Sequence, residues 1–185
     1  MSRAKSTSDP GRKGERAPAQ RKRRSAARLA AAQALYQIDL TGADPALVVV
    51  EFREHRLGQD PAGGGGAAKT EPDAAYFERL VRGVVERRAE IDAMLAPALA
   101  EGWTLARLEV VLRAALRLGA FELLAVGDVP ARVVINEYVN IAHMFFAGKE
   151  PGFINGVLDR LARRLRPGEL EGAEAGSRTG DHQGA

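Results

Sequence analysis

The chain has 185 residues, 45% of them hydrophobic, which suits one globular domain with an ordinary core. It contains no cysteine, and its three histidines lie far apart, so a disulfide framework and a Cys- or His-based metal site are excluded. No apolar run approaches the roughly 20 residues of a membrane span, and no apolar segment follows the basic N-terminus as a secretory signal requires. We therefore expect a cytoplasmic protein without a metal site.

The net charge of +3 is unevenly distributed. Residues 1–28 carry ten Lys and Arg against two Asp and Glu, whereas residues 29–185 carry 17 against 22. A basic arm on a mildly acidic body predicts a local contact with a polyanion such as nucleic acid. A solvated, solubilising tail has the same composition, so charge alone leaves both interpretations open.

Three stretches lack the apolar pattern of a packed element. Residues 1–20 are predicted to be a disordered basic arm, and residues 167–185, which are Gly-rich and acidic, a disordered tail. Residues 60–70 include four consecutive glycines and are predicted to form a flexible loop between helices. No Lys-Ser/Thr follows these glycines, which excludes a phosphate-binding loop. Residues 21–166 are left as one helical domain.

Within this domain the apolar residues recur at helical spacing, and no stretch alternates with period two for long enough to indicate a strand. The chain is predicted to be all-α, with six or seven helices. They are expected over about residues 23–40, 45–57, a segment from residue 72, 104–124, 130–148 and 150–166. Thr104 is expected to cap the 104–124 helix, and Pro97 to bend or break the one before it. The inward stripes are expected to include Leu29, Ala32, Tyr36, Leu40, Val48, Val49, Phe52, Phe77, Leu80, Val81, Val84, Leu112, Val134, Tyr138, Ile141, Val157 and Leu161.

Basic residues cluster where the first predicted helix begins. Five of them lie within eight residues: Arg21, Lys22, Arg23, Arg24 and Arg28. On one side of a helix they would meet phosphates, and binding would depend strongly on salt because neutralised phosphates release counterions. Tyr36 lies two turns beyond Arg28 and could stack on an unpaired base, although its spacing fits a core position as well.

The acidic residues form no catalytic pair. Glu122, Asp128 and Glu137 lie near predicted helix ends, where carboxylates commonly cap or pair with arginine. Trp103 is expected in the core or at a seam between subdomains. No residue set therefore predicts an enzyme.

Two further segments suggest binding surfaces. Arg113 and Arg117 are four residues apart, so they share a helix face and could bind a carboxylate-rich partner or pair with Glu109. Lys149 and Phe153 flank the start of the last predicted helix, which itself attracts phosphate, so they suit a nucleic-acid contact. Burial of Phe153 as a hydrophobic anchor fits the pattern equally.

Four motifs, taken in their order and spacing, carry a family resemblance over about residues 24–165. They are Ala27-Arg28 with Gln33-Ala34-Leu35-Tyr36-Gln37; Tyr76-Phe77 with Leu80 and Gly83-Val84; Leu116-Arg117 with Phe121-Glu122-Leu123; and Asp128-Val129-Pro130 with Ile135-Asn136-Glu137 and residues 153–159. In these motifs the chain resembles the NusB family of transcription antitermination factors.

The resemblance implies an all-helical fold of two roughly perpendicular bundles, with no catalytic activity and no cofactor. It implies binding of single-stranded boxA RNA together with NusE, a small-subunit ribosomal protein. The pair would join RNA polymerase with other Nus factors and suppress premature termination, notably on ribosomal RNA operons. An apolar helix face could serve either NusE or a homodimer, and the sequence leaves this choice open.

The resemblance also assigns residues to these contacts. The RNA-binding set comprises Arg21, Lys22, Arg23, Arg24, Arg28, Tyr36, Lys149 and Phe153. The face toward NusE comprises Glu109, Leu112 and Arg113. Two positions depart from the family pattern, because Leu112 and Lys149 stand where many relatives have acidic residues.

Two alternatives belong to other functional classes. One is a NusB-like module of an RNA cytosine methyltransferase, which would need a long α/β domain downstream and catalytic cysteines, whereas this chain has no cysteine. The other is a protein–protein scaffold that binds no RNA, against which the basic arm argues.

Overall fold

The computed structural model describes residues 11–57 and 70–171, which consist of helices joined by short loops. The α-helices in this part of the chain are α1 (Gly11–Thr41), α2 (Pro45–Glu51), α3 (Ala74–Glu86), α4 (Arg88–Leu95), α5 (Val110–Ala125), α6 (Ala131–Phe145), α7 (Glu150–Leu165) and α8 (Pro167–Glu171). A π-helical turn (Phe52–Arg56) extends α2, and 3₁₀ turns at Ala96–Ala98 and Leu105–Arg107 lie between α4 and α5. The described residues contain no strand, so the predicted all-α fold is confirmed.

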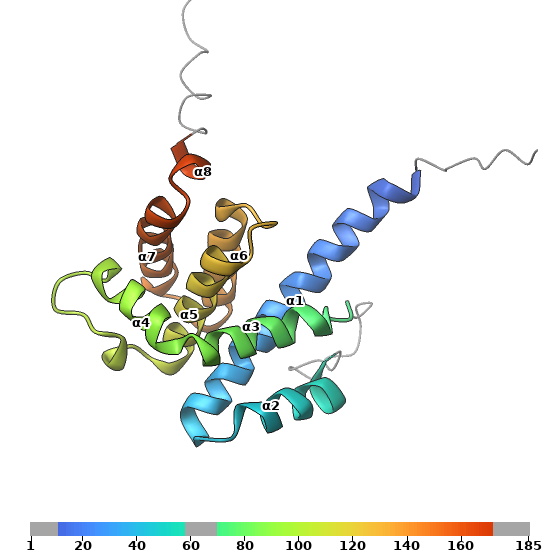
Figure 1. Cartoon of the computed structure of the whole chain (residues 1–185), viewed down its shortest axis with the longest axis horizontal. Coiled ribbons are helices and arrows are strands. Elements are labelled where there is room, and N and C mark those ends of the chain that lie inside the picture. The colour runs from blue at the N-terminus through green and yellow to red at the C-terminus, as the bar shows by residue number, and fades with distance from the viewer. Residues whose placement is uncertain (1–10, 58–69, 172–185) are drawn as a thin grey trace, which may run out of the picture.

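The helices form two bundles that meet at α5 (Figure 1). In the first, α1 packs against α3, and α2 contacts both. In the second, α5 packs against α4, α6 and α7, with α8 following α7. Figure 1 shows α3 running across the view while α6 and α7 run up it, so the two bundles cross one another.

The helix α5 is central because it is apolar on nearly every side. Every residue from Ala114 to Leu123 is buried, as expected of a helix without a polar face. Gly83 lets α3 approach it closely, since a Cβ at that position would lie 2.0 Å from the Phe121 ring. Phe52 and Phe77 stack at 5.7 Å between ring centroids and close the first bundle.

Most of the predicted inward residues are buried, but Tyr36 and Leu40 are exposed on α1. Trp103, which was expected in the core or at a seam between subdomains, does not lie in the core, because the residue is 53% exposed. The helix predicted from Thr104 begins at Val110 instead, and Thr104 makes no side-chain cap. The reason is local: buried Leu108 has extended backbone, and the Arg113 guanidinium binds the Leu105 and Leu108 carbonyls.

The ends of the predicted domain also differ. The helix α1 begins at Gly11, so residues 11–20 are helical rather than disordered, and residues 167–171 form α8. Leu170 is buried, and Glu169 accepts the backbone N–H of Ala131 at 2.7 Å, which fixes α8 against the start of α6. The predictions for residues 1–10, 172–185 and most of the loop at 60–70 fall outside the described residues.

Arg166 joins α7 to the corner between α5 and α6. Its guanidinium donates to the backbone carbonyls of Glu122, Leu123, Val126 and Val129 at 2.7–3.0 Å. These carbonyls have few intrahelical partners because they lie at and beyond the C-terminus of α5. No helix in residues 11–57 or 70–171 is long and apolar enough to cross a membrane.

Candidate nucleic-acid interface

The start of α1 presents a basic surface. Arg21, Lys22 and Arg23 are exposed, and Arg24 is half-buried. Figure 1 shows the first half of α1 extending beyond the other helices, so these cations lie where α1 leaves the body of the protein. We call Arg21, Lys22 and Arg23 the α1 basic surface. Their positive charge at a fixed edge is the arrangement that binds phosphate backbones.

This surface is held in place by the start of α3. The carbonyl of Arg23 accepts the backbone N–H of Asp73 at 3.1 Å, and the Arg23 Nε donates to the carbonyl of Glu71 at 3.2 Å. Gln20 donates to the Asp73 carboxylate at 2.8 Å, and the same carboxylate caps α3 through the Tyr76 N–H. Asp73 therefore fixes both helices at their crossing point.

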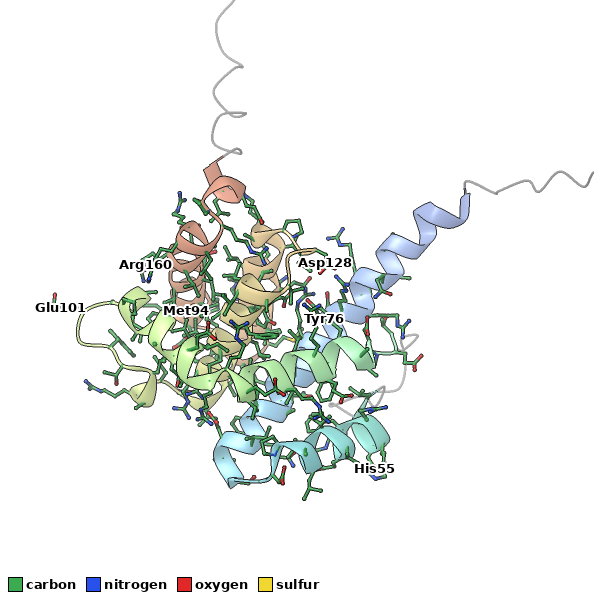
Figure 2. All side chains as sticks on the ribbon, in the orientation of Figure 1. His55, Tyr76, Met94, Glu101, Asp128 and Arg160 are labelled. Carbon is green, nitrogen blue, oxygen red and sulfur yellow. The ribbon has the colours of Figure 1, made fainter. Side chains whose placement is uncertain are left out.

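Arg24 is turned toward its own protein. It pairs with Asp128 at 2.8 Å and lies over the Tyr76 ring, 4.7 Å from its centroid. Figure 2 shows Tyr76 and Asp128 beside α1 at this point. The hydrogen bond from Arg24 lowers the pKa of Asp128, so the carboxylate stays ionised and keeps the arginine engaged.

Arg28 does not belong to the exposed surface, and its assignment as an RNA contact is corrected. It is only 2% exposed and forms a bidentate pair with Glu122, which is fully buried. Tyr76 and Tyr138 donate their hydroxyls to the same carboxylate at 2.5 and 2.8 Å. A guanidinium with these partners has no path to a phosphate.

These four side chains form what we call the Arg28 cluster, which joins α1, α3, α5 and α6. Glu137 completes its edge, 3.4 Å from Arg28 and accepting from Ser25 at 3.0 Å. Burial raises the pKa of both tyrosines, and the nearby Glu122 carboxylate raises them further. Burial alone would lower the pKa of Arg28, but the hydrogen bond and charge of Glu122 outweigh it, so the pKa is raised. The Arg28 guanidinium therefore stays charged beside Glu122.

The remaining RNA-binding candidates, Tyr36, Lys149 and Phe153, differ in how far their side chains are exposed. Tyr36 is exposed on α1, so its ring is free to stack, as the RNA-binding interpretation requires. Lys149 is exposed immediately before α7, and its carbonyl accepts the backbone N–H of Phe153 at 2.9 Å. Phe153 is half-buried against the core, and its ring contacts Trp103 at 5.6 Å between centroids.

The predicted partner face is only partly available. Glu109 is exposed, whereas Leu112 is 6% exposed and points into the core, so its assignment as a contact is corrected. Arg113 is half-buried and pairs with Asp39 at 3.1 Å rather than with Glu109. Arg117 joins the same Asp39 and also binds Asp92, both at 2.8 Å.

Sequence reasoning missed Asp39 and Asp73, whereas Glu122 was expected to cap a helix or pair with an arginine and does pair with Arg28. Asp39 and Glu122 bind arginines far away in the chain, and Asp73 binds Gln20 of α1 while it caps α3. For Glu122 a signal was present, because it stands inside an apolar run on a helix that is buried on every side. Within the described residues, no group of three His, Asp or Glu side chains could hold a metal ion.

The sequence model of the NusB family matches residues 25–163, which include the Arg28 cluster and the predicted partner face and begin just after the α1 basic surface. The chain belongs to the NusB family. The transcription antitermination protein NusB of Maricaulis maris is 52% identical over 147 residues, covering 80% of this chain and 90% of the relative. The protein of the same name from Caulobacter vibrioides is 53% identical over 143 residues, covering 77% and 94%.

Solved structures agree with this NusB assignment. The T. maritima NusB structure is 31% identical, with a TM-score of 0.64, and covers 80% of this chain and 96% of its own. A crystal structure of the antitermination factors NusB and NusE in complex with dsRNA contains a chain that is 29% identical, with a TM-score of 0.62 and coverages of 77% and 98%. The fold and the family therefore agree.

Proposed function

We propose that this NusB-family chain is a transcription antitermination factor that binds boxA RNA together with a NusE-type ribosomal protein. In this role the complex joins RNA polymerase and prevents premature termination, notably on ribosomal RNA operons. The observation that carries the proposal is the α1 basic surface, exposed at an edge of the fold and anchored on α3. The relatives named as NusB antitermination proteins support the same role.

The roles of the residues follow from their burial. Arg21, Lys22 and Arg23 contact phosphates, which supplies affinity without sequence information. Tyr36 stacks on an unpaired base. Arg28 acts by positioning α1, because its buried pair with Glu122 sets how α1 lies across α5.

The partner face is centred on Glu109, which is the exposed member of the predicted set. The solved complex of NusB and NusE with RNA supports a partner of that type for this chain. Arg113 contributes indirectly, since its contacts to the Leu105 and Leu108 carbonyls fix the loop before Glu109.

Fluorescence anisotropy of a labelled boxA RNA tests the proposal. The protein is titrated with and without NusE, against a scrambled RNA of equal length, at two salt concentrations. We expect preference for boxA, strengthened by NusE. Equal binding of both RNAs, unchanged by NusE, would refute sequence-specific recognition.

A matched set of variants tests the surface. Replacing Arg21, Lys22 and Arg23 with Ala should weaken binding to both RNAs and reduce the salt slope by about 0.7 per lost phosphate contact. The control replaces Arg53, Arg56 and Arg82 with Ala, which are exposed on the π-helical turn after α2 and on α3, so it removes the same charge outside the α1 basic surface. If both triple variants lose affinity equally, net charge rather than the α1 basic surface is responsible.

A further inference from the structure

Trp103 is the one tryptophan of the sequence, and more than half of its side chain is exposed. Tryptophan is usually mostly buried, because it carries a large apolar surface. One edge of its indole meets the Phe153 ring, with the two planes inclined at 45°. The rest of the indole therefore faces outward beside a residue of the proposed RNA-binding set.

The backbone around Trp103 is fixed on both sides. Arg160 donates to the carbonyl of Ala98 at 2.9 Å, and Arg107 reaches the carbonyl of Gly102 at 3.4 Å. Gly102 has a φ of +80°, a conformation that favours glycine, and it turns the chain just before the indole. The backbone N–H of Trp103 donates to the carbonyl of Ala100 at 3.1 Å. The ring is thus presented by an ordered turn.

A groove of about 540 Å³ opens beside the indole. Its walls include Arg88, Asp92, Trp103, Arg113 and Arg117. Arg113 and Arg117 are engaged by Asp39 and Asp92, but Arg88 is half-exposed and makes one contact, to Asp39 at 3.1 Å. Within the described residues its remaining N–H groups have no partner.

We infer that this groove binds one nucleotide of single-stranded RNA, with the base stacked on Trp103 and the phosphate held by Arg88. An exposed aromatic face beside a guanidinium is the arrangement that binds unpaired nucleotides. The inference rests on the proposed function and extends the RNA path beyond Phe153 and Lys149. Figure 2 shows Glu101, in the same loop, on the opposite side of the molecule from Asp128, which pairs with Arg24 of α1. One RNA that contacts both α1 and the groove would therefore have to cross the body of the protein.

The size of the groove favours a nucleotide over a protein partner. Its volume lies in the range of small-ligand sites, roughly 300–1,000 Å³. A stable protein interface buries about 800 Å² on each partner, far more than one groove supplies. A protein contact would instead have to extend over Glu109 and its neighbours, and that is the contrary outcome of the test.

The single tryptophan makes the test direct. The emission of Trp103 in the full chain is followed while boxA RNA is added, alongside anisotropy of the labelled RNA. We expect quenching that saturates with the anisotropy change, because a stacked base quenches indole. Trp103→Ala should weaken RNA binding by roughly 5- to 150-fold, the range for loss of one stacked base, and Trp103→Phe should restore most of it. Leu47→Ala, at an exposed apolar site on α2, is the matched control and should bind like the original chain.

The outcomes of this test distinguish failure of the inference from failure of the proposed function. Normal RNA binding with no quenching, and no loss in Trp103→Ala, would overturn the inference and leave the proposed function intact. Emission that responds to NusE alone and not to RNA would also overturn it, and would make the groove a protein contact. Absence of RNA binding by the original chain would overturn both. Far-UV circular dichroism and thermal melting establish that each variant is folded.

Discussion

Removing Arg28 should unfold the protein far more readily than removing any exposed arginine. In Arg28→Met the fully buried Glu122 carboxylate keeps the two tyrosine hydroxyls but loses its bidentate cation. Breaking a buried ion pair from one side costs about 3–5 kcal/mol, because a charge is left without compensation. For a domain of this size, that corresponds to a fall in Tm of roughly 6–20 °C.

The assay is urea unfolding followed by far-UV circular dichroism, analysed for the free energy of unfolding. Arg53→Met is the control, since the Arg53–Glu78 pair at 3.2 Å is exposed and should be worth about 0–1 kcal/mol. The double variant Arg28→Met/Glu122→Gln should recover much of the loss, because it removes the unpaired charge. A single variant within about 1 kcal/mol of the original chain, or a double variant no better than the single, would refute this reasoning.

Three further predictions concern other contacts. Arg166→Ala should lower the free energy of unfolding in urea by about 2–4 kcal/mol, because four carbonyls lose a shared charged donor. Exposed Arg164→Ala is the control, and equal stability of the two variants would show that the Arg166 contacts do not stabilise the fold. Gly83→Ala should destabilise the protein by about 1–3 kcal/mol, since the new Cβ would overlap the Phe121 ring. The control Gly152→Ala should leave stability unchanged because nothing lies within 4 Å of its Cβ, and a stable Gly83→Ala would show that Phe121 can move aside. The lowered pKa of Asp128 keeps this carboxylate ionised and paired with Arg24 across the neutral pH range. Asp128→Asn should therefore free Arg24 and increase RNA affinity there, and unchanged affinity in the anisotropy titration would mean that Arg24 does not reach RNA.

The helices and most of the core were predictable because apolar spacing reports them directly. Phe77, Leu80 and Val84 on α3 are buried as their spacing predicts. Pro97 interrupts the helix as predicted, because α4 ends at Leu95 and Pro97 lies in the 3₁₀ turn that follows. The earlier break between α3 and α4 was not predicted; it occurs at Arg87, where the backbone leaves the helical region. The position of the break at Arg87 depends on how α4 packs against α5.

The basic cluster shows where sequence reasoning stopped. Charge density along α1 located a cluster of cations but not which of them face outward. Arg28 lies three and seven residues before Ala31 and Leu35, both buried, so its helical phase already placed it inward. Its partner Glu122 is 94 residues away, and only the folded chain brings the two together.

The Arg166 contacts have a consequence for synthesis on the ribosome. The carbonyls at the end of α5 are made long before their donor, since Leu123 and Arg166 are 43 residues apart. At a synthesis rate of 5–20 residues per second, about 2–9 s pass between translation of Leu123 and translation of Arg166. Glu169, which caps the start of α6, arrives three residues later still. The second bundle is therefore completed only as the last helix emerges, and α1, which packs on α5, must wait for a surface translated after it.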